Sequence, residues 1–210
     1  MCFSAQASFT AAAICGTIGI ACVIRCERKH LMLVLVPLLF GLHQAIEGVV
    51  WLYAGQEFGK LAGLLFVGIA FCFWPTYIPL STLPLAPRGM RRNAILAILL
   101  AGIFVSLYAA TILTYPLVID FSSHKIHYIT TKVGAKWVGY LYVLAVTVPL
   151  LLMRSLYLKL FGLTVFIFLL ISLLFFFPAQ FSVWCFFSAV SSILVFLAVK
   201  QLDSQIDPTV

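Results

Sequence analysis

Residues 38–51 read LLFGLHQAIEGVVW, and this stretch decides the class of the fold. It lies inside a longer run of mostly apolar residues, Leu31–Ala54. About 20 such residues in a helix cross the roughly 30 Å hydrocarbon core of a bilayer. The run therefore predicts a transmembrane helix, in which His43, Gln44 and Glu47 are polar side chains surrounded by apolar sequence.

The composition of the whole chain also favours a membrane environment. Of its 210 residues, 64% are hydrophobic and 9% are charged, and the mean hydropathy is +1.16. A soluble globular domain carries about 25% charged residues, so this chain has too few polar side chains to cover a surface in water. We expect an all-α polytopic integral membrane protein. The net charge of +7 does not point to nucleic acid, and we expect no nucleic-acid partner. Basic residues of membrane proteins collect in cytoplasmic loops, which accounts for the charge.

Seven apolar runs are long enough for transmembrane helices. We expect these spans near Ala5–Ile24, Leu31–Ala54, Leu61–Leu83, Ala94–Tyr115, Trp137–Met153, Leu158–Phe177 and Phe181–Val199. Residues 1–200 would form one seven-helix transmembrane domain, and residues 201–210 a polar cytoplasmic tail. The longest connector is Pro116–Lys136, and alternation within its segment 126–131 predicts a short hairpin or strand.

The connectors between these spans sort by charge. One side holds nine of the thirteen basic residues, namely Arg25, Arg28, Lys29, Arg88, Arg91, Arg92, Arg154, Lys159 and Lys200. The other side holds Lys60, Lys125, Lys132 and Lys136. Because Lys and Arg favour cytoplasmic loops, we expect the N-terminus outside and the C-terminus in the cytoplasm.

Glu47 is the centre of the candidate site. His43 and Glu47 are spaced i,i+4 and share one helix face, which Trp51 continues. A charge in hydrocarbon is costly and usually has a partner and a function. No Lys or Arg lies at the depth of Glu47 in the expected spans. We therefore expect Glu47 either to be neutral or to share a proton with His43, a bound cation or a ligand amine.

Further polar residues fall near the depth of Glu47 if the first, second and seventh spans are neighbours. They would then line a pocket that leans towards the outside. The candidate ligand-binding residues are Glu47, His43, Gln44, Trp51, Ser4, Trp184, Cys185 and Ser188. Alternatively, Glu47 and His43 are buried structural groups, and the serines are packing points between helices.

Two further hypotheses concern the outer ends of the spans. His124 and His127 could fold down from the connector and join His43 and Glu47 as ligands of a zinc ion, although His-x-x-His in a loop is a weak signal. Cys2 and Cys185 both fall at the outer face and could form a disulfide or lie in contact. The sequence indicates no particular cofactor.

Several short motifs occur together in this chain. They are MCFSA at residues 1–5, Leu39-Phe40-Gly41 with Gln44, Glu47-Gly48 and Trp51, Trp74-Pro75 with Pro79-Leu80, and SVWCFFS at residues 182–188. In combination they resemble a family of small bacterial membrane proteins that begin Met-Cys-Phe-Ser-Ala, a domain of unknown function. The resemblance implies seven spans in a bacterial cytoplasmic membrane and signature residues in the pocket. It implies no activity.

These observations favour a small-molecule- or lipid-binding membrane protein, such as a sensor, a carrier or an accessory subunit. Two alternatives remain open. One is a membrane-embedded enzyme that uses Glu47, with His43 as a second candidate, as general acid/base on a lipid-soluble substrate. The other is a structural subunit of a larger membrane complex. The expected partners are membrane lipid, a small apolar ligand or another membrane protein.

Overall fold

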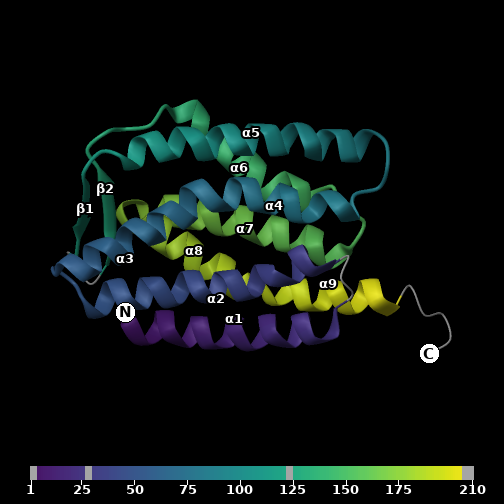
Figure 1. Cartoon of the computed structure of the whole chain (residues 1–210), viewed down its shortest axis with the longest axis horizontal. Coiled ribbons are helices and arrows are strands. Elements are labelled where there is room, and N and C mark those ends of the chain that lie inside the picture. The colour runs from purple at the N-terminus through teal and green to yellow at the C-terminus, as the bar shows by residue number, and fades with distance from the viewer. Residues whose placement is uncertain (1–3, 27–29, 122–124, 205–210) are drawn as a thin grey trace.

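The computed structural model describes residues 4–26, 30–121 and 125–204. In this part of the chain the helices lie side by side along one common axis and form an elongated bundle (Figure 1). The start of α1 and the two strands lie at one end of the bundle, and α9 ends at the other. We call the first of these the hairpin end.

The elements follow one another in a simple order. They are α1 (Ala5–Arg25), α2 (Leu31–Leu52), α3 (Glu57–Gly68), α4 (Trp74–Thr82), α5 (Met90–Leu113), β1 (Leu117–Asp120), β2 (His127–Thr130), α6 (Lys136–Leu151), α7 (Leu156–Phe175), α8 (Gln180–Ser191) and α9 (Ile193–Ser204). A π-helix, Ile69–Phe73, joins α3 to α4, and only Ser192 separates α8 from α9.

Six helical segments are long and apolar enough to cross a membrane. They are Ala5–Ile24, Leu31–Leu52, Glu57–Leu85, Met90–Leu113, Leu156–Phe175 and Gln180–Gln201. This agrees with the expected all-α membrane protein. The fifth expected span is the exception, because α6 has 16 residues and so extends only about 24 Å. Helix α9 continues to Ser204, so the first part of the expected tail is helical, and residues 205–210 lie outside the described residues.

The π-helix leaves one backbone acceptor without its usual partner. The backbone N–H of Trp74 donates to the carbonyl of Ile69, five residues earlier. In that register Pro75 would donate to Ala70, but proline has no N–H. The hydroxyl of Tyr142 donates to the carbonyl of Ala70 instead, at 2.7 Å. The backbone acceptor is thereby satisfied, and α6 is anchored to the middle of the bundle.

The first two helices pack against the last two. Helix α1 lies along α2, and both α8 and α9 contact α1 and α2. Small residues allow the close approach of α1 and α2, since a Cβ on Gly41 would lie 2.9 Å from the backbone nitrogen of Gly16. The first, second and last spans are therefore neighbours, which meets the condition on which the expected pocket depends.

The expected hairpin in the long connector is also confirmed. Strands β1 and β2 pair antiparallel, with Leu117 opposite Thr130 and Asp120 opposite His127. The hairpin packs onto α3, because Ile119 contacts Gly63 and the Tyr128 ring stacks on the Phe66 ring with centroids 5.0 Å apart. The hairpin therefore covers the end of the bundle where α2 ends.

The contact between α4 and α5 yields a stability prediction. A Cβ added to Gly102 of α5 would overlap the backbone carbonyl of Pro75, which cannot move aside as a flexible side chain would. We expect Gly102→Ala to lower the free energy of unfolding by about 1–3 kcal/mol, as overpacking does. Gly139→Ala is the matched control, because a Cβ at that position would meet no described atom within 4 Å. Equal unfolding free energies for both variants, measured in mixed micelles, would contradict this packing.

Candidate polar site around Glu47

Glu47 and Gln44 form the core of the candidate site on α2. Both side chains are 0% exposed. Ser182 of α8 is also buried, and it and Gln44 lie close enough to the Glu47 carboxyl to interact with it. Yet within the described chain neither carboxyl oxygen of Glu47, neither end of the Gln44 amide, nor the Ser182 hydroxyl has a hydrogen bond of acceptable geometry.

These unpartnered groups are energetically costly. A buried polar group without a hydrogen bond costs about 1–3 kcal/mol, and in a membrane the hydrocarbon around the helices would supply no water to compensate. Glu47 forms no ion pair with any residue that the structure describes. The arrangement is therefore one in which a bound polar species would satisfy several groups at once.

His43 is engaged elsewhere, and its two ring nitrogens have different roles. The indole N–H of Trp74 can only donate, so Nδ1 of His43 accepts from it at 3.3 Å. The second nitrogen, Nε2, then carries the hydrogen and donates to the carbonyl of Phe66 at 3.0 Å. His43 is thus a neutral imidazole with both nitrogens occupied. In this arrangement it has no free lone pair for a proton from Glu47 or for a metal ion.

Tyr128 brings the hairpin to the site. The His43 ring stacks on Phe66, with centroids 4.2 Å apart, and Phe66 stacks in turn on Tyr128. The Tyr128 hydroxyl is buried without a hydrogen-bond partner among the described residues. Burial, and secondly the nearby Glu47 carboxyl, raise the pKa of Tyr128 well above its ordinary value, so its phenol keeps its proton. Tyr128 therefore offers a hydrogen-bond donor near the carboxyl.

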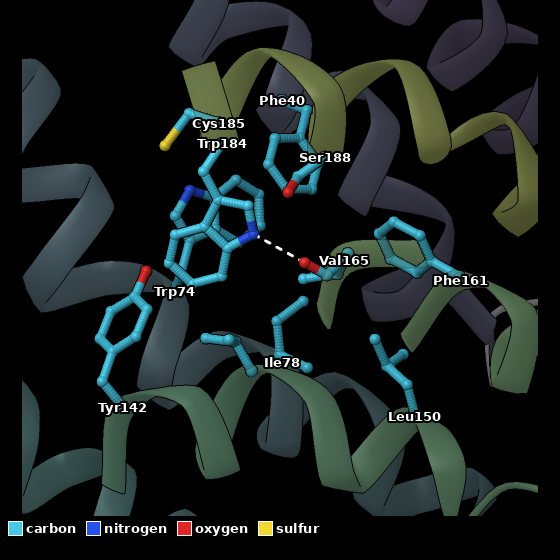
Figure 2. Close-up of a pocket in the computed structure, with 11 residues that line it drawn as sticks. Phe40, Trp74, Ile78, Tyr142, Leu150, Phe161, Val165, Trp184, Cys185 and Ser188 are labelled. Atoms are coloured by element: carbon cyan, nitrogen blue, oxygen red, sulfur yellow. Dashed lines mark hydrogen bonds between the residues drawn. The ribbon is translucent and has the colours of Figure 1, made fainter. Parts of the chain in front are cut away.

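An apolar cavity of about 30 Å³ lies among α2, α4, α6, α7 and α8. Figure 2 shows rings and aliphatic side chains around it, with the Trp184 indole N–H directed at the carbonyl of Val165. That hydrogen bond is 2.8 Å long. The residues that line the cavity are Phe40, Trp74, Ile78, Tyr142, Val146, Leu150, Phe161, Val165, Trp184, Cys185 and Ser188.

Helix α8 contributes to both the polar groups and the cavity. Ser182 and Cys185 are spaced i,i+3 and so are neighbours on the helix surface, as are Cys185 and Ser188. Ser182 interacts with Glu47, whereas Cys185 and Ser188 line the cavity. The Cys185 thiol also lies within electrostatic range of the Glu47 carboxyl. Cys185 is therefore the residue that the surroundings of Glu47 share with the cavity, whereas Glu47, Gln44 and Ser182 do not line it. We call the polar cluster and the neighbouring cavity together the Glu47 site.

The remaining sequence candidates lie elsewhere or at the margin. Ser4 caps α1, because its hydroxyl accepts from the backbone N–H of Ala7 at 3.2 Å. Trp51 is half-buried, with its ring against Phe121 of the hairpin and its indole N–H without a hydrogen-bond partner in the described chain. His127 pairs with Asp120, at 3.4 Å between Nδ1 and Oδ2.

Two hypotheses involve residues outside the described part of the chain. His124 lies there, and among the described residues no three His, Cys, Asp or Glu side chains are grouped to hold a metal ion. Cys2 lies there as well, while Cys185 is a buried free thiol.

Sequence reasoning missed several residues of the site. Ser182, Trp74, Tyr142 and Tyr128 were not among the candidate ligand-binding residues, although Ser182 and Trp74 belong to the signature motifs that the family resemblance places in the pocket. Ser182 precedes Cys185 by three residues, so the i,i+3 helical spacing from Cys185 would have found it. The contacts of Tyr128 and Tyr142 depend on the packing of the hairpin and of α6, for which the sequence holds no local signal.

Comparison with known proteins provides one match. A family model described as a family of unknown function, DUF6629, matches residues 1–207. No curated protein and no solved structure shows a significant match to the chain.

Proposed function

The chain belongs to this family of unknown function, and from its geometry we propose that it is a membrane-embedded protein that binds a small molecule at the Glu47 site. One observation carries the proposal. Five polar atoms of Glu47, Gln44 and Ser182 are buried side by side without hydrogen bonds to any described residue. A bound molecule that supplies both polar and apolar contacts would stabilise them.

The shape of the site favours a ligand with two chemically different ends. Glu47, Gln44 and Ser182 offer hydrogen bonds at one end. The cavity among Trp74, Trp184 and Tyr142 offers apolar and aromatic surface at the other. Pockets for small molecules commonly combine a mostly apolar lining with a few convergent polar groups. Sensing, carriage or the accessory role of a subunit would all use such a site.

We propose a bacterial cytoplasmic membrane as the location, crossed seven times with α6 as the short span. Exposed leucines such as Leu100 and Leu107 on α5 suit contact with lipid tails. Among the described residues, four lysines belong to the hairpin end and seven basic residues to the opposite end, which favours the hairpin end outside. The Glu47 site would then lie nearer to the outer surface.

Reporter fusions test this orientation. We expect a reporter that is active only outside the cytoplasm to work within Pro116–Lys136 and to fail after Val210, because the charge distribution keeps the opposite end inside. A reporter active after Val210 and silent in the connector would reverse the orientation.

Native mass spectrometry of the protein purified in mild detergent tests the binding function. We expect a bound mass on the wild-type protein that is lost from Glu47→Gln. Glu57→Gln is the matched control, since Glu57 is an exposed glutamate paired with Lys60 on the surface. Absence of any bound mass from the wild type, or its equal retention in both variants, would overturn the proposal.

A further inference from the structure

We propose that the Glu47 site takes a primary ammonium ion with a short alkyl substituent, held by Glu47, Gln44 and Ser182. This inference rests on the proposed binding function and names the chemical class of the ligand. It follows from the charge, the number of free acceptors and the size of the neighbouring cavity.

Charge is the first argument. Among the described residues of the membrane-spanning helices, Glu47 is an acidic residue whose side chain is buried. Its carboxyl has no basic partner among the described residues. His43 does not serve as one, because Trp74 and Phe66 occupy both ring nitrogens. Buried ionisable groups in a membrane pair with an opposite charge. A cationic ligand would supply that charge.

The number of acceptors is the second argument. A primary ammonium has three N–H donors, as the lysine side chain does. Besides the Tyr128 hydroxyl, the site presents three acceptor groups that no described residue satisfies, namely the Glu47 carboxyl, the Gln44 carbonyl oxygen and the Ser182 hydroxyl. Each donor therefore finds one acceptor, and hydrogen bonds to a charged partner are the strong ones.

The nearby cavity, which shares Cys185 with the surroundings of Glu47, is the third argument, and it favours an alkylammonium over an inorganic cation. A water-sized sphere takes roughly 10–15 Å³ of such space, so about 30 Å³ holds about two non-hydrogen atoms. Apolar lining keeps such a cavity dry, which suits a methyl or ethyl group better than water. The rings of Trp74, Trp184 and Tyr142 also attract a nearby cation through their π faces.

Thermal unfolding of the full chain in detergent, after dialysis into ligand-free buffer at pH 7, tests the class of ligand. The probes are ethylammonium chloride, sodium chloride and tetramethylammonium chloride at equal ionic strength. We expect ethylammonium to raise the Tm by roughly 5 °C or more near saturation. Sodium lacks an alkyl group, and tetramethylammonium is too large and has no N–H donor, so neither should raise it.

Two variants locate the effect. Glu47→Gln should lose the rise with ethylammonium, and Glu57→Gln, the surface control, should keep it. A rise of equal size with sodium chloride, or one that persists in Glu47→Gln, would overturn the inference. So would the absence of any rise.

Mass spectrometry distinguishes failure of the ammonium inference from failure of the proposed binding function. A bound mass that lacks an amine and depends on Glu47 would leave the binding function standing and exclude the ammonium. No bound mass together with no thermal shift would contradict both.

Discussion

Glu47→Gln should leave the protein folded while its affinity for the ligand falls at least tenfold, or about 1.4 kcal/mol. The amide keeps the volume of the carboxyl and still offers hydrogen bonds, but it cannot balance a cationic ligand. Hydrogen bonds to charged groups contribute about 1.5–3 kcal/mol, so their loss reaches or exceeds the tenfold effect. Binding of the co-purified molecule, or of ethylammonium, to the purified variant measures this.

Yield and melting temperature of the ligand-free variant are the necessary controls. We expect both to match the wild type, because Gln44 and Ser182 gain a neutral neighbour of equal size. Glu47→Leu should in addition disturb packing, since it removes the polar neighbour of both groups. Wild-type affinity in Glu47→Gln would mean that Glu47 is a neutral structural acid.

Trp74→Ala should be among the most destabilising substitutions in the described chain. Trp74 is buried, stacks on Phe40 with ring centroids 4.1 Å apart, and donates to His43. Truncating a packed Trp removes many contacts and leaves a cavity, which costs about 3 kcal/mol or more. The free energy of unfolding in mixed micelles measures this loss.

Trp74→Phe separates the hydrogen bond from the packing. It retains most of the stacking but leaves Nδ1 of His43 without a donor, so we expect an intermediate loss of about 1–3 kcal/mol. Trp137→Phe is the matched control, because Trp137 is 53% exposed on α6. If Trp74→Phe and Trp137→Phe had equal free energies of unfolding, the hydrogen bond from Trp74 to His43 would contribute nothing to stability.

The sequence predicted the membrane class, the helical segments and the hairpin because these depend on local patterns. Long apolar runs define α1 and α2, and alternation of residues defines β2. Glu47 also stood out, since a carboxyl in such a run conflicts with its surroundings. Burial of Glu47 and Gln44 agrees with that interpretation.

The sequence did not predict which side chains pair across helices. The i,i+4 spacing suggested His43 as a partner for Glu47, but the structure directs His43 towards Trp74 and the Phe66 carbonyl on another helix. Those partners depend on how the third long helix is rotated, and the π-helix before Pro75 changes that rotation. Tyr128 reaches the site only because the hairpin folds over α3.

An experimental density map of the purified protein in a lipid nanodisc tests the central claim most directly. We predict density for a bound species between the Glu47 carboxyl, the Gln44 amide and the Ser182 hydroxyl, within hydrogen-bond distance of all three. Gln44 and Ser182 bonded directly to Glu47, with no space between them, would contradict the account.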